Sequence, residues 1–152
     1  MAHLGFFIDA NLLVLLVVGR TRPSLINRHR RLKEYSESDY ETLVGLLDHG
    51  SKIFVTPNTL TETSNLLAYG PTDINSQLFA LLKSMIEDSK EVVVLSKVAS
   101  KVPEFGWLGL TDAVLVGVAT RDTPLITADL RLWNAVAIRD PYAVVNFNTL
   151  RL

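Results

Sequence analysis

Four carboxylates are the side chains of this sequence best placed to do chemistry: Asp9, Glu62, Asp112 and Asp129. Acids that share one crevice repel one another, and their pKa values rise unless a cation compensates. Mg²⁺ and Mn²⁺ prefer such hard oxygen ligands and also bind substrate phosphates. Two of these ions, roughly 4 Å apart, can activate a water and stabilise the leaving oxygen of a phosphodiester. The chemistry to expect is therefore metal-dependent phosphodiester hydrolysis.

The position of each acid in the chain supports grouping them. Asp9 directly follows an apolar run at 4–8, and Asp129 lies two residues beyond another at 124–127. Ligands of open parallel sheets bind outside the carboxyl ends of the strands. The other two acids lie early in predicted helices, near the same edge. Taken singly, each acid also has a structural explanation, such as a helix cap for Asp129, so the ordered set carries the prediction.

Short apolar runs alternate with helix-length segments, which predicts one α/β domain over 1–152 with a five-stranded parallel sheet and helices on both faces. The predicted strands are 4–8, 52–56, 91–95, 124–127 and 143–147. The predicted helices are 10–18 (ended by Gly19), 38–48 (opened by a Ser38–Glu41 capping box), 57–69, 73–88, 111–119 (capped by Thr111) and 129–137. The stretch 20–36 is predicted to be a loop or a short helix.

Composition narrows the functional classes. Hydrophobic residues make up 48% of the 152 residues, enough for a folded core. The chain has no cysteine, which excludes disulfides, zinc knuckles, iron–sulfur clusters and thiol catalysis. The apolar stretch 4–18 is interrupted by polar residues and lacks the features of a signal peptide. Its unbroken part is too short to span a bilayer. We expect a cytoplasmic protein with no membrane partner.

The formal net charge is only -1, but the positive charge is unevenly distributed. Six of the 15 basic residues lie between Arg20 and Lys33, with no acid among them. Such a patch can bind phosphates, with Arg28, Arg30 and Arg31 as its central members, although charge runs are also typical of solvated surface. The segment 20–33 is called the basic segment below.

The remaining candidates for chemistry are weaker. The three histidines are scattered and show no ligand spacing. Trp107 and Trp133 are better explained by packing than by base stacking. The stretch 101–110 is loop-like and could flank the site because it ends just before Asp112.

In these motifs the chain resembles the PIN-domain nucleases. Four short segments match in order along residues 4–147: Phe6–Asn11, Thr59–Leu67, Gly109–Ala113 and Leu125–Asp129. The resemblance implies a PIN-like domain that cleaves RNA with Mg²⁺ or Mn²⁺. It implies that the four carboxylates bind the metal, with Asn11 and Thr127 as supporting polar residues. Many small bacterial members are toxins of toxin–antitoxin pairs (VapC-type), commonly dimeric and inhibited by an antitoxin, so the resemblance also implies a homodimer and an antitoxin partner.

The sequence departs from compact toxin members in the long gap between Asp9 and Glu62, which holds the basic segment and a further helix. Two other functions stay open. One is a catalytically silent PIN-like module that binds RNA or protein. The other is a phosphatase of the haloacid dehalogenase type, which also begins with a strand and an Asp nucleophile. That class needs a second acid two residues on, where this chain has Asn11.

Overall fold

The computed structural model describes residues 3–47 and 51–151 and contains a sheet of five parallel strands. In spatial order the strands are β3 (Lys90–Glu91), β2 (Lys52–Val55), β1 (Gly5–Ile8), β4 (Leu125–Thr127) and β5 (Val144–Asn146). The predicted α/β class and five-stranded parallel sheet are confirmed. The strand order turns at β1, because β2 lies on one side of it and β4 on the other. A crevice forms at such a turning point.

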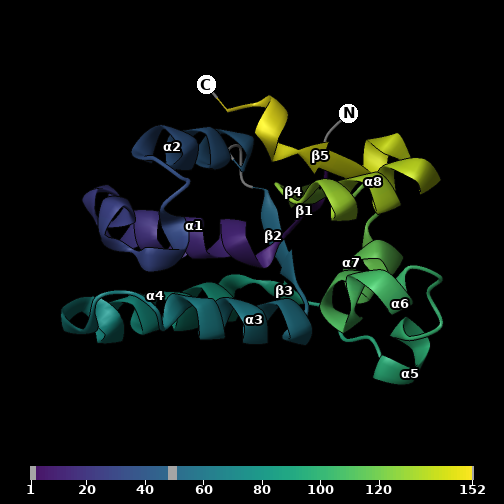
Figure 1. Ribbon diagram of the computed structural model, residues 1–152, viewed down its shortest axis with the longest axis horizontal. Helices are drawn as coiled ribbons and strands as arrows, with labels where there is room; N and C mark the ends of the chain where they lie inside the picture. The colour runs from purple at the N-terminus through teal and green to yellow at the C-terminus, as the bar shows by residue number, and fades with distance from the viewer. Residues whose placement is uncertain (1–2, 48–50, 152) are drawn as a thin grey trace.

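Helices cover both faces of the sheet (Figure 1). The helices drawn to the left of the sheet are α1 (Ala10–Thr21), α2 (Glu37–Leu46), α3 (Pro57–Leu67) and α4 (Asn75–Asp88). Those to the right are α5 (Ser96–Ala99), α6 (Phe105–Leu108), α7 (Leu110–Val118) and α8 (Leu130–Arg139). Within the described residues, no helix is long and apolar enough to cross a membrane.

Alternating side chains of β1 and β4 divide the core in two. Phe6, Ile8 and Ile126 pack with α1, α2 and α4 on one face. Phe7 and Leu125 pack with α7 and α8 on the other. This alternation follows from the two-residue period of a strand. The central strands are therefore packed on both faces, and this packing fixes the position of their carboxyl ends.

The first helix is longer than predicted. It continues through Gly19 to Thr21. A Cβ at Gly19 would lie 2.1 Å from the Tyr40 ring, so glycine is needed here for the close approach of α2 rather than as a helix stop. The basic segment after it forms two 3₁₀ helices, Pro23–Arg28 and Arg30–Leu32.

The cap predicted at Ser38 and Glu41 was wrong. Ser36 caps α2, and its side chain and backbone exchange hydrogen bonds with Asp39 in a capping box. Arg151 stabilises this capping box because its Nε donates to Asp39 Oδ1 at 3.1 Å. The predicted end of this helix at Asp48 lies outside the described residues.

The predicted third strand at 91–95 was also wrong in extent, because β3 has only two residues. Its neighbour is β2, and β2 ends at Val55 where the chain turns into α3. Beyond the bond from Val92 N to Val55 O, the backbone pairs with no other strand of residues 3–47 and 51–151. The predicted loop at 101–110 contains the short helix α6, and Gly109, at φ 86°, precedes α7 in place of the predicted cap Thr111.

Candidate active site

Asp9 is a fixed point at the carboxyl end of β1. Its backbone N–H donates to Ile126 O of β4 at 3.0 Å, and its carbonyl accepts from Leu13 N at 2.9 Å. Its side chain is buried, and Oδ1 accepts from Ala10 N at 2.8 Å. The carboxylate is therefore held in one orientation by the sheet on one side and by the start of α1 on the other.

Thr127 completes this hold from the neighbouring strand. Its hydroxyl donates to Asp9 Oδ2 at 2.8 Å and accepts from the Asp129 backbone N–H at 3.0 Å. Because an N–H can only donate, the hydroxyl proton must point at Asp9. Thr127 thus couples the ends of β1 and β4, 118 residues apart in sequence, and is fully buried.

Glu62 and Asp112 approach the site from α3 and α7, two helices in contact. Glu62 lies in the second turn of α3, and Asp112 in the first turn of α7. Both are partly buried. Neither side chain makes a hydrogen bond to any residue of the described chain. They differ from Asp9 in this respect. A ligand that bound Glu62 or Asp112 would displace no hydrogen-bond donor of the described residues.

Asp129 is exposed and caps α8. Its Oδ1 accepts from Arg131 N at 2.9 Å and from Leu132 N at 3.3 Å. Oδ1 of Asp129 therefore caps the helix, as the structural explanation predicted. Its Oδ2 has no hydrogen-bond partner within the described residues and remains available to the crevice.

The four carboxylates lie within electrostatic reach of one another. The pKa of Asp112 is raised to about 7, chiefly by burial and then by the charges of Asp9, Asp129 and Glu62, against the opposing Arg131. Burial and Asp9 raise the pKa of Glu62. Burial also raises the pKa of Asp9, with Asp129 adding to it and the Thr127 and Ala10 hydrogen bonds opposing it. Shifts of this kind, in a cluster at a sheet edge, are typical of functional sites.

The donor set suits a hard divalent cation in kind, because it consists only of carboxylate oxygens. Within residues 3–47 and 51–151, no three His, Cys, Asp or Glu side chains form a ready-made metal cage. Mg²⁺ does not require one, since it keeps several waters and commonly binds through one or two carboxylates. Glu62 and Asp112 also have no hydrogen bonds that fix their present orientations. The residues therefore fit such an ion.

The basic segment is attached to α3 through His29. Arg31 N donates to His29 Nδ1 at 3.1 Å, so Nε2 carries the ring proton and donates to Leu67 O at 3.0 Å. Burial lowers the pKa of His29, which favours this neutral form. Gly70 lies against the ring, where a Cβ would approach its Cδ2 to 2.7 Å. His29 is thus a positioning residue for the arginines beside it.

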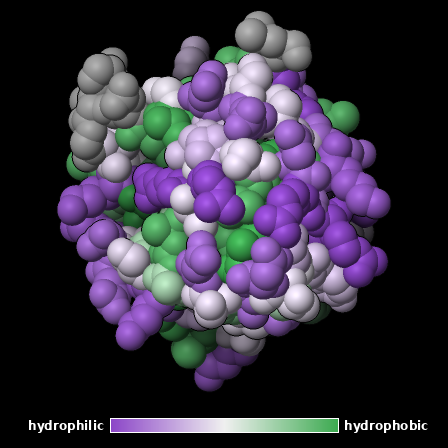
Figure 2. Space-filling model, turned by 90° about the vertical axis from the view of Figure 1, so that its left-hand side faces the viewer, coloured by the Kyte–Doolittle hydropathy of each residue, from purple (hydrophilic) through white to green (hydrophobic). Residues whose placement is uncertain are grey.

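The three arginines predicted to bind RNA are exposed but differ in their contacts. Arg28 pairs with Asp73 at 3.0 Å. Arg30 and Arg31 lie 5.8 and 5.6 Å from the centroid of the Tyr69 ring. Neither Arg30 nor Arg31 forms an ion pair with an acid among residues 3–47 and 51–151. Figure 2 shows the side of the molecule seen from the left of Figure 1, with hydrophilic side chains spread over most of it.

Asn11 brings the basic segment next to the acids. It is exposed near the start of α1, two residues after Asp9. It lines a hollow of about 270 Å³ together with Arg30, Arg31 and Lys33. Glu34 and Tyr35 complete the lining. Asn11 therefore lies two residues after Asp9 in the chain and beside the cations of this hollow, and it makes no hydrogen bond to Asp9.

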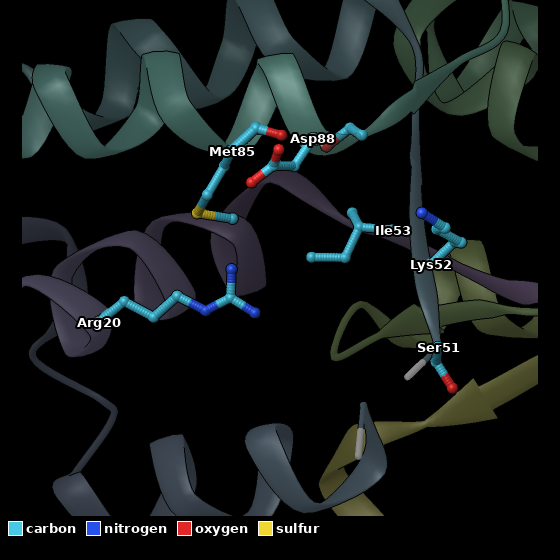
Figure 3. A pocket seen from close by; sticks show the side chains of 7 residues that line it. Arg20, Ser51, Lys52, Ile53, Met85 and Asp88 are labelled. Atoms are coloured by element: carbon cyan, nitrogen blue, oxygen red, sulfur yellow. Dashed lines mark hydrogen bonds between the residues drawn. The ribbon is translucent and has the colours of Figure 1, made fainter. Parts of the chain in front are cut away.

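A second hollow of about 270 Å³ lies at the opposite edge of the sheet (Figure 3). Arg20 extends into it from the end of α1, and Asp88 faces it from the end of α4, with Lys52 at the start of β2. The amino end of β2 is the edge away from Asp9. This hollow is therefore separate from the candidate active site.

Sequence reasoning missed two neighbours of the acids. Tyr35 has its pKa raised by burial and in part by the charge of Asp9. Arg131 opposes the rise in the pKa of Asp112. The signal for Arg131 was present, because it follows Asp129 by two residues in a predicted helix. No sequence pattern around Tyr35 indicates a role at the site. The course of the basic segment through the fold brings this residue near the acids.

Comparisons of this chain with protein-family models, with characterised proteins and with solved structures find no significant match.

Proposed function

We propose that this protein is a metal-dependent endoribonuclease that hydrolyses RNA at the four-carboxylate site. The observation that carries the proposal is the grouping of four acids at the turning point of the sheet, where burial and then the charges of the other three acids raise the pKa of Asp112 to about 7. Uncompensated, this arrangement is unfavourable. A cation and a phosphate that bind there would offset the repulsion among the acids, and this is the best explanation for their grouping.

Each residue has a separate part in the proposal. When bound, Mg²⁺ or Mn²⁺ would activate a water and stabilise charge on the leaving oxygen. Asp9, held by Thr127, supplies a carboxylate of fixed direction. Glu62 and Asp112 supply carboxylates without competing donors, and Asp129 supplies Oδ2.

The basic segment provides the affinity for the strand in this proposal. Arg30 and Arg31 bind its phosphates, and Arg28 contributes less because of its pair with Asp73. Asn11 lines the hollow beside these cations, where it can contact the strand. We also propose a cytoplasmic location, because a chain without cysteine suits a reducing compartment. A homodimer and an antitoxin partner remain part of the proposal, and light scattering of the purified protein tests the dimer.

The test is cleavage of single-stranded and structured RNA with Mn²⁺ or Mg²⁺, with EDTA as the metal-free control. Asp112→Asn should reduce the rate by at least about a hundredfold, the usual loss when an electrostatic group of a site is removed. The matched control is Asp122→Asn, which removes an exposed acid from the loop before β4, at the opposite edge. It should cleave like the wild type.

Other outcomes would replace the proposal. Equal cleavage by all three proteins, insensitive to EDTA, would indicate a contaminating nuclease and no activity of this chain. RNA binding without cleavage under any metal would favour the silent binding module. A trapped acyl-phosphate on Asp9 would favour the phosphatase.

A further inference from the structure

An open aromatic surface adjoins the acids at the start of α8. Trp107 is 49% exposed and Leu130 is 61% exposed, so Trp107 lies at the edge of the packed core and not inside it. Together with Arg131, Trp133 and Asn134 they line a hollow of about 380 Å³, within the usual range of small-ligand sites. These five residues are called the shelf. The shelf begins at the residue that follows Asp129.

The shelf is held rigidly to the candidate site. The guanidinium of Arg131 lies 5.3 Å from the centroid of the Trp107 ring and donates to the Trp107 carbonyl at 2.9 Å. The backbone N–H of Arg131 is in turn held by Asp129 Oδ1 at 2.9 Å. The indole, the guanidinium and the carboxylate therefore keep a fixed relation to one another.

We propose that the shelf stacks an unpaired base of the RNA strand that lies across the four carboxylates. This inference rests on the proposed function and adds that the substrate is single-stranded at the site. An exposed aromatic ring beside an arginine is the usual platform for a base of any sequence, because every base has a π-face. Asn134 adds an amide that can hydrogen-bond a base edge.

Charge and position favour a nucleotide over a protein segment as the occupant. The shelf begins beside Asp129 of the proposed metal site, and its one charged side chain is a cation. A base inside a duplex is already stacked and cannot reach such a surface without leaving the helix. The shelf therefore selects for strands or loops whose bases are free.

The test measures RNA binding in the Asp112→Asn background with EDTA, so that cleavage cannot interfere. The probe is a labelled single-stranded RNA of about 12 nucleotides, a length typical of single-strand sites. Trp107→Leu should weaken binding about tenfold, equivalent to about 1.4 kcal/mol. Trp107→Phe should bind nearly as well as the parent, because phenylalanine still stacks. If the leucine variant fails to fold, the phenylalanine variant still carries the fluorescence test below.

Tyr142→Leu is the matched control. Tyr142 is 70% exposed and lies under Arg121, with the guanidinium 4.8 Å from the ring centroid. It precedes β5, at the opposite edge of the sheet from the acids. The control therefore removes an aromatic ring that is more exposed than Trp107 and also lies against an arginine, and it should leave RNA binding unchanged.

Fluorescence gives a second, direct readout. RNA should quench the tryptophan emission, and Trp107→Phe should remove the part of that quench that comes from Trp107, leaving the part from Trp133, while affinity is retained. A duplex of the same sequence should bind Trp107→Leu and its parent equally. Equal losses in Trp107→Leu and Tyr142→Leu, or no quench, would overturn the inference. Conversion of a dimer to a monomer by Trp107→Leu, with RNA affinity unchanged, would overturn it in favour of an interface between copies.

The inference and the proposed function fail in different ways. If Trp107 supports binding but the wild type with Mn²⁺ cleaves nothing, the nuclease proposal fails and the shelf stands. If the wild type cleaves RNA and Trp107→Leu binds and cleaves RNA as its parent does, the inference about the shelf is wrong and the nuclease proposal stands. If no variant binds RNA, both are wrong.

Discussion

Replacing Asp112 with asparagine should stabilise the metal-free protein at pH 8 while it removes cleavage. The substitution keeps the size of the side chain, and no hydrogen bond to the described residues is lost with the carboxylate. It removes the negative charge that burial and the other three acids disfavour. A buried acid that destabilises the fold is expected at a binding site.

The magnitude follows from the pKa. The pKa of Asp112 is raised from 3.8 to about 7 in the folded protein, so the folded state binds this proton more tightly than the unfolded state. The stabilising contribution of the protonated form is complete below pH 4 and is lost as the pH rises through about 7. At about 1.4 kcal/mol per pKa unit the full loss has a ceiling of about 4 kcal/mol. Because Asp112 is partly exposed, solvent screening reduces this, and we expect about 1–2 kcal/mol between pH 5 and pH 8.

The assay is urea unfolding of wild type and Asp112→Asn in EDTA at both pH values. The advantage of the variant should grow from pH 5 to pH 8, and titrations common to both proteins cancel in the difference. Asp122→Asn is the control and should show no such growth. Added Mn²⁺ should stabilise the wild type at pH 8 more than the variant, by mass action. A variant that is less stable than the wild type by the same amount at both pH values would show that Asp112 is structural and refute this reasoning.

Three further predictions concern the supports of the site. Thr127→Val should lower the free energy of unfolding by about 1–3 kcal/mol, because a buried carboxylate oxygen of the site loses its donor; Thr127→Ser, which keeps the hydroxyl, should restore most of it in the same urea assay. Arg30→Glu with Arg31→Glu should weaken RNA binding and flatten its dependence on log salt by about one unit per residue; an unchanged slope would assign these arginines to solvated surface. Gly70→Ala should lower both the melting temperature and RNA affinity, since its Cβ would lie 2.7 Å from the buried histidine ring. Gly45→Ala, at a helical position with no atom of the described residues within 4 Å of its Cβ, should instead stabilise by about 0.5–1 kcal/mol.

The sequence predicted those parts of the site that depend on local pattern. Asp9 and Asp129 follow strands, and the direction of a parallel strand already places them at one edge. The contact from Thr127 to Asp9 depends on the pairing of β1 with β4, which joins residues 118 positions apart. The resemblance supplied Thr127 as a supporting residue, but the residue pattern alone could not supply its partner.

Non-local partners also explain the mistaken element boundaries. Ser36 and Ser38 both begin a serine–x–x–acid pattern, so local sequence could not choose between them. Asp39 is selected because Arg151, at the far end of the chain, pairs with it at 3.1 Å. The third strand was overpredicted for the converse reason: its valines favour a strand, but β2, its one neighbour in the part of the chain that the structure describes, ends at Val55.

The basic segment and the shelf approach the acids from opposite layers of the fold. Leu32, at the end of the basic segment, packs in the core on the side of α1. Trp133, which lines the shelf, packs against the core on the side of α7 and α8. A strand that crosses the sheet edge would therefore meet cations, carboxylates and an aromatic ring in turn.

This order makes the two outer contacts separable by a double-mutant cycle. Sites that are far apart and share no partner lose binding free energy additively. If one RNA strand spans the edge, Arg31→Glu and Trp107→Leu together should weaken its binding by the product of their separate factors. If instead Trp107 binds another molecule, Trp107→Leu will change nothing in the Arg31→Glu background. The same cycle with a strand too short to span the edge should retain only one of the two effects, because a bound dinucleotide cannot reach both contacts.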